Sequence, residues 1–203
     1  MLTPAEDPVD QQTSPNAARL AEQAASRAVA SRDRASGVAL WLRDLVIAAA
    51  IAVVFITVLY QPVRVEGTSM LPDLEDHDRL FINKFVYQFQ SIHRGDVVVF
   101  HYPRDPEKSY IKRVIGLPGD RIWIDQGRVW LNGQPQRESY VPDKYRDSRS
   151  MAEMVVPADS YFMMGDHRSI SSDSREFGPV ERELIYGKAV FVYWPARDAG
   201  VVR

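Results

Sequence analysis

A long apolar run in the first third of the chain gives way to short alternating stretches, and the two patterns predict different structures. From Leu45 to Val63 the sequence carries no charged side chain, a length close to the roughly 20 residues that a helix needs to cross a bilayer. Arg43 and Asp44 mark the leading edge of this run. We therefore expect a transmembrane helix over residues 38–60. The alternative is a buried core helix, but soluble helices of this length normally carry a polar face.

The segment before this helix is polar and Ala-rich, and it predicts a disordered or loosely helical tail over residues 1–37. It holds few large apolar residues, so it lacks the apolar surface that a packed core requires. Several arginines precede the apolar run, whereas only Arg64 follows it closely. By the positive-inside rule, the N-terminus lies in the cytoplasm and residues 61–203 lie outside, with a single membrane span.

Short runs of β-branched and aromatic residues follow Val63 and predict β-strands. Turn residues separate them, as at Asn132 and Gly133. Long amphipathic helical patterns are missing, so we expect residues 61–203 to form a mainly β domain of barrel or sandwich type. The polar residues 137–157 interrupt it as a variable excursion. The predicted strands cover residues 79–83, 96–100, 110–115, 121–124, 128–131, 160–164 and 188–193.

Composition narrows the classes of function. The formal net charge of −2 gives no basic face for nucleic acid. The chain has no cysteine, which excludes disulfides, zinc–thiolate sites and a Cys nucleophile. Its 4 histidines show no metal-ligand spacing. We therefore expect no metal and no cofactor.

Two stretches carry residues suited to nucleophilic catalysis. Ser69 follows Gly67 and Thr68 and precedes Pro72 just past the apolar run; on its own it is also compatible with an ordinary loop serine. Lys112 lies in a predicted strand, where alternation places it beside apolar neighbours. Desolvation lowers the pKa of a lysine, and a neutral lysine can take the proton of a serine hydroxyl. An exposed lysine is the alternative interpretation.

A third stretch is dense in hydroxyl, carboxylate and guanidinium groups. Asp166, Arg168, Asp173 and Arg175 lie within it, and their charges can pair and hold a neighbouring site rigid. A solvated turn explains the same composition.

Together these stretches resemble the bacterial type I signal peptidases, which are also called leader peptidases. The resemblance covers nearly all of the chain from the anchor onward. It comprises the anchor and four boxes in the family's order. These are S-M-x-P at 69–72, R-G-D-V-V-V-F at 94–100, Y-I-K-R-x-x-G-L-P-G-D at 110–120 and G-D-x-R with S-x-D-S-R at 165–175.

The resemblance implies a signal-peptidase-like β-barrel or sandwich with serine–lysine catalysis. Ser69 matches the family's nucleophile and Lys112 its general base. Ser171 matches the serine that orients the lysine, while Asp173 and Arg175 match a supporting salt bridge. The Ser69 N–H would form part of the oxyanion hole.

The resemblance also implies the substrate and the location. The substrates would be secretory preproteins, cleaved after a small-x-small site such as Ala-x-Ala. The enzyme would sit in the bacterial plasma membrane, in contact with the lipid bilayer. The positions that match the pocket walls for substrate residues −1 and −3 are Val65, Met70, Leu74, Tyr110 and Ile111.

The sequence departs from the family's pattern at some positions, and it is also compatible with other functions. Gly67 lacks the hydroxyl that some relatives place two residues before the nucleophile, and His167 stands where Asn is commoner. His167 as the base is a further alternative, although the lysine already fills that role. Arg113 lies on the opposite strand face, and Arg113→Ala is expected to retain appreciable activity. Two other functions are a catalytically inactive membrane-tethered β-module and a self-cleaving repressor protease of the SOS type.

Overall fold

The computed structural model describes residues 15–202 of the chain. The chain divides into two compact units, of which the first ends at Phe55 and the second begins at Ile56. The helical elements are α1 (Pro15–Leu59), α2 (Val86–Phe89), α3 (Ser174–Phe177), and the 3₁₀ turns η1 (Asp143–Tyr145) and η2 (Arg182–Leu184). The strands are β1 (Tyr60–Arg64), β2 (Arg79–Asn83), β3 (Val97–Tyr102), β4 (Asp105–Gly116), β5 (Arg121–Asp125), β6 (Arg128–Leu131), β7 (Gln134–Pro135), β8 (Met151–Val155), β9 (Ser160–Met164), β10 (Val180–Glu181), β11 (Ile185–Trp194) and β12 (Gly200–Val201).

Helix α1 contains one segment that is long and apolar enough to cross a membrane. The window Leu40–Leu59 has a mean hydropathy of 2.4 and none of it is buried, so its length and composition suit a membrane crossing. The helix ends just before Pro62, because a proline disfavours helical backbone at the residue before it. The helix begins at Pro15, so it includes residues 15–37 of the segment predicted as a disordered or loosely helical tail. Residues 1–14 of that tail lie outside the described residues.

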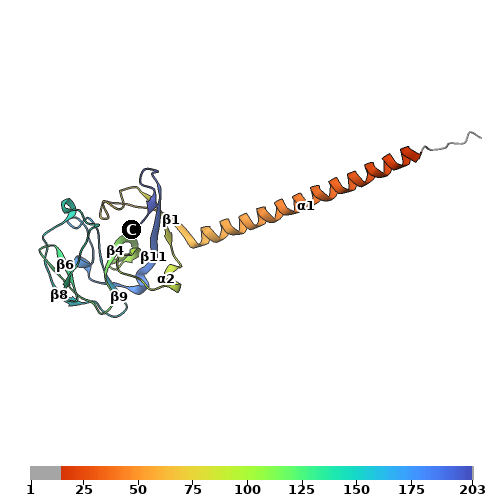
Figure 1. The fold of residues 1–203 in the computed structure, drawn as a ribbon. Coiled ribbons are helices and arrows are strands. Elements are labelled where there is room, and N and C mark those ends of the chain that lie inside the picture. Colours follow the sequence, from red (N-terminus) through yellow and green to blue (C-terminus); the bar gives the residue numbers. More distant parts are fainter. Residues whose placement is uncertain (1–14, 203) are drawn as a thin grey trace, which may run out of the picture. The chain divides into compact units, whose positions relative to one another are not determined.

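The second unit contains two antiparallel sheets, which confirms the predicted mainly β fold. The larger sheet has the strand order β1-β2-β11-β3-β4-β9-β10, with β12 paired to β11. The smaller sheet has the order β7-β6-β5-β8. In Figure 1, β6 and β8 lie together while β4 and β11 belong to the other sheet.

Strands form at each of the predicted positions, and the sequence did not predict β1, β7, β8, β10 and β12. Strand β8 falls within the predicted excursion over 137–157 and pairs with β5. The Asn132-Gly133 turn joins β6 to β7, with φ values of 50° and 84°. This left-handed geometry matches the twist of a hairpin and suits Asn followed by Gly.

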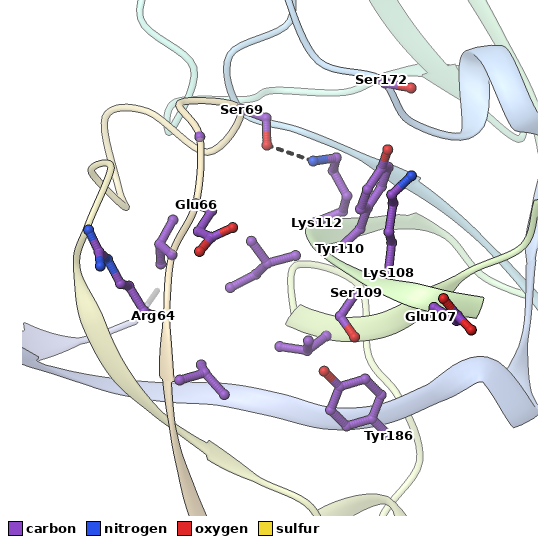
Figure 2. Close-up of a pocket in the computed structure, with 15 residues that line it drawn as sticks. Arg64, Glu66, Ser69, Glu107, Lys108, Ser109, Tyr110, Lys112, Ser172 and Tyr186 are labelled. Atoms are coloured by element: carbon purple, nitrogen blue, oxygen red, sulfur yellow. Dashed lines mark hydrogen bonds between the residues drawn. The ribbon is translucent and has the colours of Figure 1, made fainter. Parts of the chain in front are cut away.

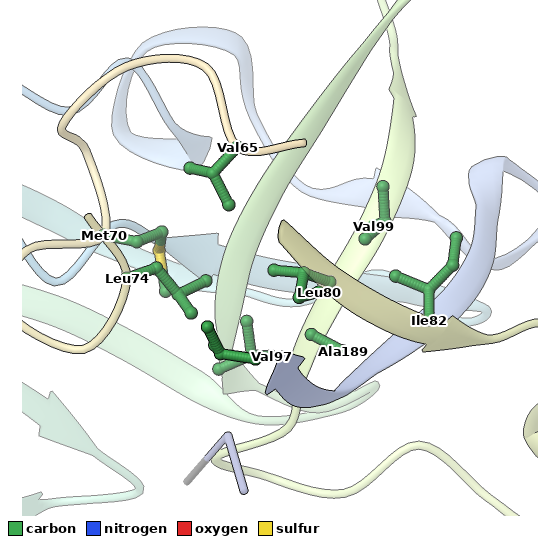
Figure 3. Close-up of a cluster of buried hydrophobic side chains, with 9 residues drawn as sticks. Val65, Met70, Leu74, Leu80, Ile82, Val97, Val99 and Ala189 are labelled. Carbon is green, nitrogen blue, oxygen red and sulfur yellow. The ribbon is translucent and has the colours of Figure 1, made fainter. Parts of the chain in front are cut away.

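The core of the second unit consists of three clusters of buried apolar side chains. One fills the space under the loop between β1 and β2, and its members are Val65, Met70, Leu74, Leu80, Ile82, Val97, Val99, Ala189 and Val192 (Figure 3). A second gathers around Phe100 and Met163. The third joins the two sheets, because Phe162 and Met164 of β9 pack with Ile122 of β5 and Val129 of β6. The smaller sheet is thereby fixed to the larger one.

Two tryptophans stack on the smaller sheet. Trp123 of β5 and Trp130 of β6 are cross-strand partners, with ring centroids 5.5 Å apart and planes 9° from parallel. Cross-strand aromatic pairs of this kind stabilise a β-hairpin.

Candidate active site

Ser69 lies in the loop between β1 and β2. Buried side chains next to it in the sequence hold this loop in place. Met70 is 1% exposed and Leu74 is completely buried, and both belong to the cluster drawn in Figure 3. Their burial anchors the loop, while a backbone hydrogen bond from Leu74 N–H to the Met70 carbonyl closes one turn of it. Ser69 itself is half-buried and borders a groove. Because Met70 and Leu74 anchor the loop in the core, the Ser69 hydroxyl lies at the surface.

Lys112 reaches this hydroxyl from the middle of β4. Its Nζ lies 2.6 Å from Ser69 Oγ, as the dashed line in Figure 2 marks. The lysine is 4% exposed, and Tyr110, two residues earlier on the same strand face, places its ring 5.3 Å from Nζ. Burial lowers the pKa of Lys112 to about 8, although the nearby Asp173 and Asp166 carboxylates oppose that shift. The desolvated lysine expected from strand alternation is thus present beside Ser69.

The segment between β9 and α3 supplies the charges around this pair. Asp173 is fully buried, and its carboxylate accepts hydrogen bonds from Arg175 at 2.7 and 2.8 Å. It also accepts one from the Gly165 N–H at 3.1 Å. Despite its burial, these bonds hold the pKa of Asp173 below its usual range. The carboxylate is therefore ionised and fixed.

Ser171 lies close to this carboxylate and to the loop that carries Ser69. Its hydroxyl is buried, and within residues 15–202 it makes no hydrogen bond of normal geometry, although it is close enough to Asp173 to favour the ionised carboxylate. A Cβ on Gly165 would come within 2.3 Å of Ser171 Oγ and 2.4 Å of the Ser69 carbonyl oxygen. Only glycine at position 165 lets these two segments approach so closely.

A groove of about 740 Å³ runs past Ser69 and Lys112. Of the residues predicted to line the substrate pockets, Val65, Tyr110 and Ile111 do line this groove. Met70 and Leu74 do not line it, since they lie in the buried cluster beneath it. Sequence reasoning missed other lining residues, such as Tyr186 of β11 and Ser172 (Figure 2). Pairing between distant strands brings these residues together, which no local pattern reveals.

Arg113 is buried and paired with two carboxylates, which strand alternation alone does not indicate. It is 2% exposed, and its guanidinium donates to both carboxylate oxygens of Asp166, at 2.6 and 2.8 Å. The same guanidinium donates to Asp73 at 2.7 Å. Asp73 follows Ser69 in the nucleophile loop, so Arg113 ties that loop to β4 and to the loop after β9. Arg113 therefore holds these loops together because both faces of β4 are buried at this position, while the expected activity of Arg113→Ala stays a prediction.

A second buried ion pair, also unforeseen, connects the predicted excursion to the site. Arg168 donates two hydrogen bonds to the Glu138 carboxylate, at 2.6 and 2.7 Å, with both side chains nearly inaccessible. Within the described part of the chain, no group of three or more His, Cys, Asp or Glu side chains has the arrangement of a metal site.

Known proteins resemble the chain over this region. Residues 38–194 match a family model described as signal peptidase, peptidase S26. A signal peptidase I from Leptolyngbya laminosa is 42% identical over 146 residues, 67% of this chain and 70% of the relative. One from Bacillus licheniformis is 33% identical over 169 residues, 78% of this chain and 89% of the relative. The crystal structure of a signal peptidase I from Enterococcus faecalis is 27% identical, has a TM-score of 0.44, and covers 49% of this chain and 97% of that one.

Proposed function

The chain belongs to the signal peptidase family, peptidase S26, and on this premise we propose that Ser69 is its nucleophile and Lys112 its general base. As a member of the family, it is a serine endopeptidase that removes signal peptides from secretory preproteins. The observation that carries the residue assignment is the 2.6 Å contact between Lys112 Nζ and Ser69 Oγ at the edge of the groove.

The reaction begins when neutral Lys112 takes the proton of the Ser69 hydroxyl. Oγ then attacks the carbonyl carbon of substrate residue −1, and the new ammonium gives its proton to the leaving amine. Water hydrolyses the resulting acyl-enzyme ester with the same lysine as base. Burial supports this role, because a pKa of about 8 leaves a useful fraction of the amine neutral near pH 7.

The supporting residues keep the base oriented. Asp173, held by Arg175 and by the Gly165 N–H, presents a fixed negative charge toward the lysine. Ser171, whose buried hydroxyl lies close to Asp173, is the residue to which we assign the positioning of the amine. The Ser69 N–H donates to the oxyanion that forms on the substrate carbonyl.

The substrate lies extended in the groove, beside the strands that line it. Val65, Tyr110 and Ile111 form walls that leave room for small side chains at positions −1 and −3, in an Ala-x-Ala-like site. Met70 and Leu74 contribute to the pocket only indirectly, because they fix the loop that carries Val65 and Ser69. Specificity then follows from the steric limit of these walls.

The span in α1 anchors the enzyme in the bacterial plasma membrane. We assign residues 1–37 to the cytoplasm, 38–60 to the lipid bilayer and 61–203 to the extracytoplasmic side, in a single-pass topology. The arginines that precede the span support this orientation, and the catalytic domain then lies on the side where exported preproteins emerge.

Replacement of the nucleophile tests the residue assignment. Purified full-length protein in detergent should cleave a preprotein at one site, mapped by mass spectrometry. Ser69→Ala should abolish this cleavage and lower the thermal midpoint by only a few degrees, because it removes one hydrogen bond of about 1 kcal/mol. Ser109→Ala is a matched control, because this exposed serine also lines the groove and has no catalytic part. A folded Ser69→Ala protein that still turns over substrate refutes the assignment.

A further inference from the structure

His167 holds the backbone on both sides of the nucleophile. Its own N–H donates to the Ser69 carbonyl at 3.0 Å. Its imidazole Nδ1 lies 3.1 Å from the Thr68 carbonyl oxygen. A carbonyl oxygen only accepts, so Nδ1 carries the proton of this bond. One residue of the loop after β9 therefore fixes the carbonyl of each of the two peptide groups that flank the Ser69 Cα.

The peptide group between Thr68 and Ser69 determines the direction of the Ser69 N–H. The carbonyl that His167 holds and the N–H of Ser69 belong to the same planar unit, in which they point in opposite directions. Fixing the carbonyl therefore fixes the direction of that N–H. Within residues 15–202 the Ser69 N–H has no hydrogen-bond acceptor, so it is available to a substrate oxygen.

We propose that His167 is a positioning residue for the oxyanion hole, acting through the Thr68–Ser69 peptide group. The inference rests on the proposed function, in which the Ser69 N–H stabilises the oxyanion. A hydrogen bond to the carbonyl also polarises the peptide group and strengthens its N–H as a donor. The work of catalysis stays with Ser69 and Lys112, and the imidazole never touches the substrate.

Two neighbours support this role. Gly67 has no side chain to act as a second oxyanion donor, so the orientation of the Ser69 N–H carries more weight here. The ring of Tyr145, in η1, packs edge-on against the imidazole with centroids 4.5 Å apart. A general-base role does not fit, because Lys112 Nζ and not the imidazole contacts Ser69 Oγ.

The test compares His167→Ala with His167→Asn in the full-length protein, using a preprotein with an Ala-x-Ala site. The side-chain amide of Asn can place its N–H near the position of Nδ1, whereas Ala removes the donor. We expect His167→Ala to lower kcat between about five- and fifty-fold, less than the loss of a direct oxyanion donor. KM should stay the same, because the contact matters only in the transition state. His167→Asn should recover most of the lost activity.

Three further measurements separate this role from others. The pH at which kcat/KM rises should be the same in both variants as in the parent, since Lys112 and Ser69 are untouched; a shift would point to His167 as a base and overturn the proposal. His93→Ala is the control, because this exposed histidine lies outside the groove and should leave kcat unchanged. Thermal unfolding reports whether the variants fold.

Other outcomes overturn the proposal directly. Parental kcat in His167→Ala would show that the contact has no catalytic effect, and equal losses in the Ala and Asn variants would show that the Nδ1 hydrogen bond is not what matters. If the loss of kcat in His167→Ala is accompanied by a lowered thermal midpoint that accounts for it, His167 is merely structural and the proposal is overturned. Cleavage by Ser69→Ala would instead refute the proposed function, so the two failures are distinguishable.

Discussion

The Lys112 side chain is 4% exposed, so its ammonium has lost nearly all contact with water. Burial lowers its pKa to about 8, which favours the neutral form that a base requires. The same burial therefore affects both the reaction and the stability of the fold, and each effect leads to a prediction at this residue.

Arginine at position 112 should inactivate the enzyme. Lys112→Arg keeps the positive charge, but a guanidinium does not lose its proton in the working pH range. We expect a loss of kcat/KM of at least about a hundredfold, at the lower end of what general-base catalysis contributes. In the parent enzyme, kcat/KM on a preprotein should rise with pH up to about 8, where Lys112 loses its proton. Parental activity in Lys112→Arg would show that the lysine acts only as a charge.

Removing the charge should stabilise the fold. The folded pKa of about 8 lies below the unfolded value near 10.4, so the unfolded chain binds more protons between these pH values and the free energy of unfolding rises with pH there. At pH 7 the buried ammonium costs about 3 kcal/mol, and its hydrogen bond to Ser69 returns about 1. Lys112→Met should therefore raise the free energy of unfolding at pH 7 by about 2 kcal/mol.

Denaturant unfolding of the full-length protein in detergent measures this gain, and the rise between pH 8 and 10 should be smaller in the variant. Lys84→Met, at an exposed lysine, provides the comparison and should change little. An unfolding free energy in Lys112→Met no higher than that of the parent would mean that the ammonium is well solvated.

Two neighbouring residues show which features of the site the sequence pattern predicts and which it does not. Alternation correctly placed Lys112 among apolar neighbours, because that inference needs only the strand itself. It also placed Arg113 on the opposite face, but it did not reveal the partners Asp166 and Asp73, which come from loops far away in the sequence. Alternation tells which residues share a face, but not what packs against that face.

The elements around the site depend on a buried ion pair between distant loops. Glu138 lies in the predicted excursion and Arg168 in the loop after β9, with side chains 3% and 2% exposed. Removing one partner leaves the other charge buried without compensation, at a cost of about 3–5 kcal/mol. Glu138→Ala should therefore lower the free energy of unfolding by about this amount.

The exposed pair of Arg121 and Glu153 provides a matched control. Its side chains are 63% and 42% exposed, and surface pairs contribute at most about 1 kcal/mol. Glu153→Ala should thus change stability far less than Glu138→Ala in the same denaturant titration. Equal losses in the two variants would contradict the structural importance assigned to the buried pair.

The excursion itself was underestimated because its own sequence is polar and weakly periodic. Strand β8 forms there through pairing with β5, and Glu138 is buried only because Arg168 meets it. The strongly alternating segments were predicted correctly, since their pattern alone determines them. Short strands that depend on a partner carry no comparable signal.

In the proposed binding mode, the walls of the groove set a steric limit on the substrate. Val65 from the nucleophile loop and Ile111 from β4 line the groove, so a preprotein with Phe in place of Ala at position −1 should be cleaved at least about tenfold more slowly. Ile111→Ala should widen the wall and recover part of the loss for an intermediate side chain such as Val. Equal cleavage of the Ala and Phe substrates would refute the role of these walls.

For the whole molecule, the proposed topology can be tested with a single thiol. The chain contains no cysteine, so one introduced Cys is a unique label. In intact bacterial cells or spheroplasts, Gln134→Cys in the β-domain should react with a membrane-impermeant maleimide. Ala24→Cys, in the segment before the span, should react only after lysis. The reverse pattern would overturn the orientation derived from the arginines.

The stacked tryptophans on the smaller sheet provide an intrinsic spectroscopic signal. Two indoles 5.5 Å apart and nearly parallel couple their electronic transitions, and this coupling gives an exciton signal in circular dichroism that exists only while β5 and β6 are paired. The signal reports on the smaller sheet alone, whereas cleavage activity reports on the site in the larger one. Following both during unfolding would show whether the two sheets lose their order together.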